Sequence, residues 1–190
     1  MRLTRAILAT AFLFAFAIGC SNPIEGFALP AATAPAGATA PEASPSPLGR
    51  ACSLLSADEL RTTVAGEAGS LDSTESAPVG EAATIVHECR YVRRATSSPV
   101  ASLAITATKG DFPDAALTNV ENRCVNAPIT MADVSNIAMY CTYPDQVIAV
   151  ATAKSSHGET RVAVLALNHA LGDLEPQQLS SLGRLVANRI

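Results

Sequence analysis

Aromatic residues are scarce in this chain of 190 residues. Tryptophan is absent, and the three aromatic types together make up 4% of the chain. Carbohydrate-binding sites and the energetic centres of many protein interfaces depend on aromatic side chains. Their scarcity argues against a sugar-binding protein. Lysine is also rare, since only Lys109 and Lys154 occur.

Motifs that would indicate an enzyme or a metal protein are missing. The chain contains no Cys-x-x-Cys sequence and no Gly-x-Ser-x-Gly sequence. Its three histidines, His87, His157 and His169, do not have the spacing of a metal-binding helix. We therefore expect a protein that is not an enzyme, with no catalytic residues, no bound metal and no cofactor.

Basic residues are fewer than acidic residues. The formal net charge is −4, from 13 basic and 17 acidic residues. Two of the basic residues, Arg2 and Arg5, belong to a segment that we expect to be removed, which leaves 13 − 2 = 11 basic residues and a charge of 11 − 17 = −6. This balance gives no reason to expect nucleic acid as a partner. It also argues against a basic patch that binds anionic lipid head groups.

The first twenty residues have the pattern of an export signal. Two arginines precede an apolar run, Ala6–Ile18, which is too short for a comfortable membrane span. The run ends in Ala17-Ile18-Gly19-Cys20, and a cysteine directly after small residues is typical of a bacterial lipoprotein signal. We expect residues 1–19 to be removed and Cys20 to be acylated, so that the protein is extracytoplasmic and anchored to the cell membrane through Cys20. The alternatives are an ordinary secreted protein and an uncleaved anchor.

Residues 20–50 have the composition of a spacer. Residues 21–50 contain eight alanines and six prolines, with many serines and threonines. Such a composition cannot bury a core, so we predict a disordered linker. An extended spacer would reach roughly 90 Å at about 3.1 Å per residue. Residues 51–190 are then long enough for one domain with its own core.

Four cysteines follow the spacer: Cys52, Cys89, Cys124 and Cys141. An even number of cysteines in an exported domain indicates disulfides. Three pairings are possible, and we expect Cys52–Cys89 and Cys124–Cys141 because sequential pairing closes the shortest loops. Use of these cysteines in a metal or redox site is the alternative, but their spacing fits no zinc pattern.

The polar and apolar pattern predicts helices and strands in a mixed order. Ser56 and Glu59 form a capping box for a helix that ends near Gly66. Alternating residues then predict strands, with Ile85, Cys89 and Tyr91 facing inward. The predicted strands are 84–92, 100–109, 134–142, 146–154 and 160–167. Two further helices are predicted at 114–124, capped by Asp114, and from Asp173 to the end. Short hairpin links imply an α+β fold, an antiparallel sheet with helices on one face.

The segment 51–60, Ala-Cys-Ser-Leu-Leu-Ser-Ala-Asp-Glu-Leu, resembles the opening of an actinobacterial surface-lipoprotein family. This family is catalogued as domain of unknown function 3558. Its second mark is a later cysteine followed two residues on by an aromatic residue, here Cys89 and Tyr91. The family often has tryptophan there, so Tyr91 is a departure. The resemblance implies a surface lipoprotein and supplies no catalytic residues.

One basic and aromatic cluster, Arg90, Tyr91, Arg93 and Arg94, offers a possible contact for an anionic polymer or lipid head group, although a solvated strand is the favoured interpretation. The expected function is a cell-envelope lipoprotein that acts as a non-catalytic binding or interaction module. Its expected partner is an envelope protein or an apolar ligand. The alternatives are an envelope hydrolase with a site built from loops and an accessory sensor domain.

Overall fold

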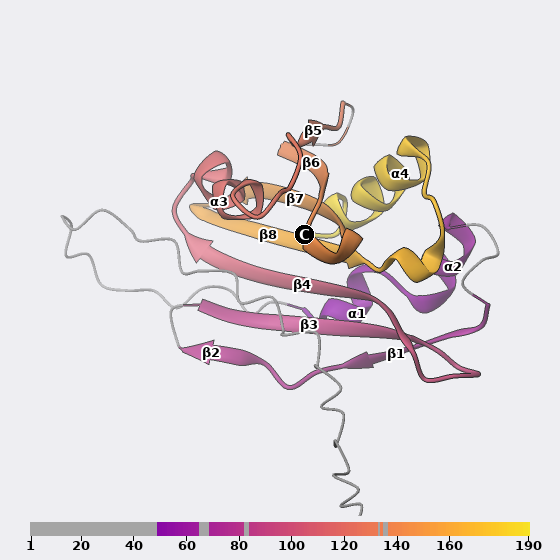
Figure 1. Ribbon diagram of the computed structural model, residues 1–190. Coiled ribbons are helices and arrows are strands. Elements are labelled where there is room, and N and C mark those ends of the chain that lie inside the picture. Colours follow the sequence, from indigo (N-terminus) through magenta and orange to yellow (C-terminus); the bar gives the residue numbers. More distant parts are fainter. Residues whose placement is uncertain (1–48, 65–68, 82–83, 133, 135–136) are drawn as a thin grey trace, which may run out of the picture.

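The computed structural model describes residues 49–64, 69–81, 84–132, 134 and 137–190. Within these residues, eight strands form one antiparallel sheet in the order β1-β3-β4-β8-β7-β6-β5, with β2 paired to β3 beyond the end of β1 (Figure 1). The strands are β1 (Leu71–Glu75), β2 (Val79–Glu81), β3 (Thr84–Arg93), β4 (Pro99–Lys109), β5 (Ile129–Thr130), β6 (Ile137–Thr142), β7 (Ile148–Ser156) and β8 (Glu159–Leu167). The predicted α+β class and the antiparallel sheet are confirmed.

The helices divide between the two faces of the sheet. The described helices are α1 (Ala51–Leu54), α2 (Ala57–Thr63), α3 (Pro113–Glu121) and α4 (Pro176–Ala187), with short 3₁₀ turns at Pro144–Gln146 and His169–Leu171. Buried side chains of α1, α2 and α4 share one hydrophobic cluster with inward residues such as Leu103 and Leu165. We call this side of the sheet the inner face.

Helix α3 covers the other face, which differs from the prediction that all helices share one face. Leu117 and Val120 pack with Met139, Ala151 and Val164 in a second cluster. Val164 and Leu165 are neighbours on β8, and adjacent side chains of a strand point to opposite faces. The second cluster therefore lies behind the first. The run of buried residues along β8 reflects this cover on both faces.

The helix caps only partly match the sequence pattern. The capping box is present, since the Glu59 amide donates to Ser56 Oγ and the Ser56 amide donates to Glu59 Oε2. The cap of α3 is Phe112 rather than Asp114, and the cap of α4 is Glu175 rather than Asp173. In both helices proline follows the cap directly, and its fixed φ suits the first helical position. Gly66, the predicted end of the first helix, lies outside the described residues.

The shortest helices and strands were not predicted from the sequence pattern. Helix α1 was not predicted, and neither were strands β2 and β5, which are too short to show a period. Inward residues of β3 also differ in burial: Tyr91 is fully buried as expected, whereas Ile85 is 39% exposed. Both lie on the same face, but Ile85 lies at the strand end, opposite Gly80 of β2.

Candidate functional site

Two disulfides join all four cysteines of the folded domain. Cys52 of α1 is bonded to Cys89 of β3, with a Cα–Cα distance of 4.9 Å. Cys124, just after α3, is bonded to Cys141 of β6, with a Cα–Cα distance of 5.7 Å. Both predicted pairings are confirmed. One disulfide therefore fastens the inner layer, which α1, α2 and α4 form on the inner face, to the sheet. The other fastens the end of α3, on the opposite face, to β6.

A carboxylate fixes α1 beside the first disulfide. Glu75 lies opposite Cys89 in the pairing of β1 with β3, and its carboxylate accepts hydrogen bonds from the amides of Ala51 and Cys52, both at 2.8 Å. The two sulfur atoms and the carboxylate lie within 4.8 Å of one another, a grouping that resembles a metal site. The disulfide engages both sulfur atoms, and a thiolate is the form that binds metal. In the oxidised protein this group is therefore structural.

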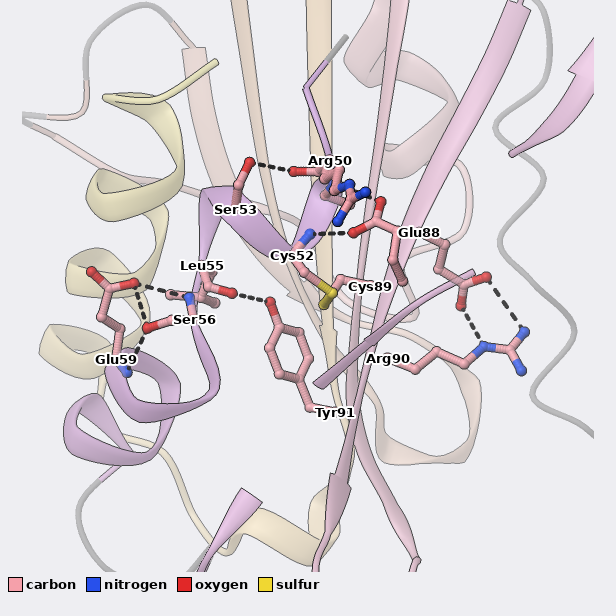
Figure 2. The surroundings of a disulfide bond; sticks show 12 residues. Arg50, Cys52, Ser53, Leu55, Ser56, Glu59, Glu88, Cys89, Arg90 and Tyr91 are labelled. Carbon is pink, nitrogen blue, oxygen red and sulfur yellow. Dashed lines mark hydrogen bonds and ion pairs between the residues drawn. A yellow bond between two sulfur atoms is a disulfide. The ribbon is translucent and has the colours of Figure 1, made fainter. Parts of the chain in front are cut away.

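Tyr91 lies two residues after Cys89 on β3, on the same face of the strand. Its side chain is fully buried, and its hydroxyl donates to the carbonyl of Leu55 at 2.6 Å (Figure 2). Burial raises the pKa of this phenol, and the charges of Glu75 and Glu59 raise it further. Tyr91 therefore stays neutral and links β3 to the segment between α1 and α2. It has no surface with which to contact a ligand.

The predicted basic cluster is divided between the faces of the sheet. Arg90 is paired with Glu88 at 3.1 Å on the side away from Tyr91 (Figure 2). Arg94 is paired with Asp72 at 2.6 Å, and this guanidinium lowers the pKa of the Asp72 carboxyl. The guanidinium of Arg93 donates to the carbonyl of Ala170. The structure thus gives these arginines separate internal partners and does not bring them together at one site.

The histidines also lie apart. His87 is half-buried on β3, His157 is in the turn between β7 and β8, and His169 begins the 3₁₀ turn after β8. His157 and His169 lie at opposite ends of β8, which spans roughly 30 Å at about 3.3 Å per residue. His157 Nδ1 is 2.7 Å from Ser156 Oγ, its sequence neighbour in an exposed turn. No catalytic set of histidine with serine and carboxylate is assembled from these positions within the described residues.

An ion pair that the sequence did not indicate joins the end of the chain, after α4, to helix α2. Arg189, after α4, contacts both carboxylate oxygens of Glu59 at 2.9 and 2.6 Å and also donates to the carbonyl of Leu54. Arg189 and the amide of Ser56 lower the pKa of Glu59 to about 2. This contact spans 130 residues, so no local pattern could have revealed it.

The predicted lipidation site, Cys20, lies outside the described residues. None of the described helices is long and apolar enough to cross a membrane. Comparison of the chain with protein-family models, curated proteins and solved structures gave no match. The resemblance of segment 51–60 to a lipoprotein family therefore stays a prediction.

Proposed function

We propose that this protein is a cell-envelope lipoprotein, anchored through Cys20, whose α+β domain is a non-catalytic interaction module. The use of the cysteines is the main support. The domain's four cysteines form two disulfides, which fits a domain outside the cytoplasm. The one cysteine left over is Cys20, in the position that a lipoprotein signal requires.

The spacer and the site geometry agree with this proposal. A proline-rich stretch of about thirty residues separates Cys20 from α1 in the sequence. The polar groups around the first disulfide, which include Glu75, Tyr91 and Arg90, have internal partners. Groups engaged in this way serve the fold, which favours recognition by a surface over chemistry at a cleft.

Cell fractionation of wild-type protein and of Cys20→Ser tests the anchor. We expect wild-type protein in the membrane fraction and in the detergent phase of a Triton X-114 separation. The Cys20→Ser variant should leave both, because it lacks the thiol that carries the lipid and so loses about 0.8 kcal/mol of membrane binding for each CH₂ that the acyl chains bury. The matched control is Ser21→Ala, which should stay with the membrane. Equal partitioning of Cys20→Ser and wild type would contradict the proposal.

A further inference from the structure

The surface around the second disulfide combines features that the fold does not require. It lies where α3 leads into β5 and where β6 turns into β7. We call it the Cys124–Cys141 corner and define it by Glu121, Val125, Ile129, Asp145 and Gln146. All five residues are exposed.

Two large apolar side chains of the corner face water. Val125 is 64% exposed and Ile129 is 53% exposed. Both lie in the segment 125–130, in which every residue is exposed. The other two large apolar side chains with comparable exposure among the described residues, Val79 and Ile85, lie at the opposite edge of the sheet. Single exposed apolar residues are common, but two on one short segment need an explanation.

The segment 125–130 is held at both ends. The Cys124–Cys141 disulfide precedes it, and the amide of Val125 donates to the carbonyl of Thr142 at 2.8 Å. At the other end Ile129 lies opposite Tyr140 in the pairing of β5 with β6. Three residues lie between Val125 and Ile129, but only one lies between Tyr140 and Thr142, so the segment bulges between its attachments. A loop braced in this way loses little conformational entropy when it binds.

Strained backbone lies beside the braced loop. Asp145 and Gln146 both have positive φ, 61° and 58°, in the turn between β6 and β7. Non-glycine residues in this region cost of order 1–3 kcal/mol each, and such strain gathers at functional positions. Glycine occupies the second turn position in the next hairpin, where Gly158 has a φ of 76°. Ser97 and His157 have similar φ values, 55° and 54°, in two other turns, so the pair of adjacent residues, and not positive φ alone, distinguishes this turn.

Charge distinguishes between the possible occupants. The corner has two exposed acidic residues, Glu121 and Asp145, and one exposed cation, Arg123, whose guanidinium lies over the Tyr143 ring at 4.8 Å. The net charge of these three residues is 1 − 2 = −1. The segment 125–130 itself has no aromatic residue and no cation, the types that anchor loops in a bilayer surface. A corner with net negative charge does not attract anionic lipid. It is repelled by a second copy of itself, because a symmetric contact brings like charges together.

We propose that the Cys124–Cys141 corner is the docking surface of this module and that it inserts Val125 and Ile129 into an apolar recess of a protein whose rim is cationic. The proposal rests on the proposed function, because it names the class of partner for the same module.

The experiment uses the full chain in the bacterium from which it derives. A photo-reactive benzoylphenylalanine replaces Asn126, between the two apolar residues, and a control protein has it at Thr74, exposed on β1. We expect irradiation to give one adduct of fixed mass with an envelope protein at position 126 and not at position 74. No adduct, an adduct with lipid, or an adduct of twice the chain's mass would overturn the proposal.

Competition makes the cross-link specific. Added Cys20→Ser chain should suppress the adduct in isolated envelopes. The same chain with Val125→Ser and Ile129→Thr should need at least about tenfold more protein, as expected for central apolar anchors. Asp145→Asn should weaken competition roughly two- to fivefold and reduce its salt dependence. Val79→Ser, a change at a 70% exposed valine on β2, is the matched control and should compete like the parent. Equal competition by the double variant would overturn the proposal.

Two further measurements separate the possible failures. The substituted side chains are exposed, so the thermal midpoint of each variant should stay within about 2 °C of the parent. Fractionation of the same cultures reports the anchor independently of the cross-link. Membrane-bound protein without an adduct at position 126 contradicts the docking surface alone, whereas protein outside the membrane fraction contradicts the lipoprotein proposal.

Discussion

At the scale of single residues, the inner layer depends on polar contacts between segments that are distant in sequence. Tyr91 reaches the carbonyl of Leu55, and Glu75 accepts from two amides of α1. Each contact satisfies groups that the short helix α1 cannot satisfy internally. Their removal should therefore cost stability.

The hydroxyl of Tyr91 provides the first test. Tyr91→Phe keeps the ring but leaves the Leu55 carbonyl without its donor, and an unsatisfied buried acceptor costs about 1–3 kcal/mol. We expect the free energy of unfolding in urea to fall by about that amount, with an unchanged m-value. Tyr140→Phe, at a half-buried tyrosine of β6, is the control and should fall by less than half as much. An equal loss in both variants would show that the hydroxyl bond is not the cause.

The ion pair of Glu59 with Arg189 makes stability depend on pH. The pKa of Glu59 is about 2 in the folded protein, below its ordinary value of 4.5. Ionised Glu59 therefore stabilises the fold above about pH 4.5, and this contribution is lost as the pH falls from 4.5 toward 2.

Glu59→Gln isolates that contribution, since glutamine can keep the capping box. The pair is partly solvated, so we expect a loss of about 1 kcal/mol at pH 7. The difference between variant and wild type in the free energy of unfolding should shrink on acidification below pH 4.5. A difference that is constant from pH 7 to pH 2 would contradict the role of the charge.

At the scale of elements, some features were readable from sequence and others were not. Ser56 and Glu59 are three residues apart, so their capping box is a local pattern. The disulfides were predictable because each joins neighbours in the order of cysteines. The side of the sheet that α3 covers was not predictable, because the buried runs of β7 and β8 permit cover on either face. The contact of Glu75 with α1 depends on strand register, which local sequence does not fix.

The two disulfides should differ in what they contribute. They close loops of different length, with sequence separations of 37 and 17 residues. The loop-entropy relation gives about 4 kcal/mol for the first and about 3 kcal/mol for the second. We expect the double variant Cys52→Ala/Cys89→Ala to lose more stability in urea than Cys124→Ala/Cys141→Ala.

Removal of the first disulfide also releases α1 from β3, whereas the second fastens only the end of α3 to β6. Hydrogen exchange should therefore rise in α1 when the first is absent and in the segment 125–130 when the second is absent. A larger loss of stability from the second pair would contradict this assignment of the two bonds.

At the scale of the whole molecule, the described residues form one α+β domain with helices on both faces of its sheet, and the export signal and spacer before it stay predictions. The antiparallel sheet and both disulfides of the domain were predicted from the alternation of apolar residues and from the order of the cysteines. The site was harder to infer, because Arg90 and Tyr91 of the predicted cluster point to opposite faces of β3 and Arg94 lies in the turn after that strand. The Cys124–Cys141 corner gave no sequence signal, since exposure of Val125 and Ile129 depends on how β5 pairs with β6.

The mass of the intact protein tests the lipid anchor and the disulfides together. The protein is extracted from its own cells in detergent without reductant and treated with a thiol alkylating agent. If the protein is a lipoprotein anchored through Cys20, the chain begins at Cys20 and has the added mass of acyl groups. The alkylating agent should add no mass until the disulfides are reduced, and after reduction it should add four groups. A chain that begins at Met1, with all five cysteines alkylated before reduction, would contradict the lipoprotein proposal.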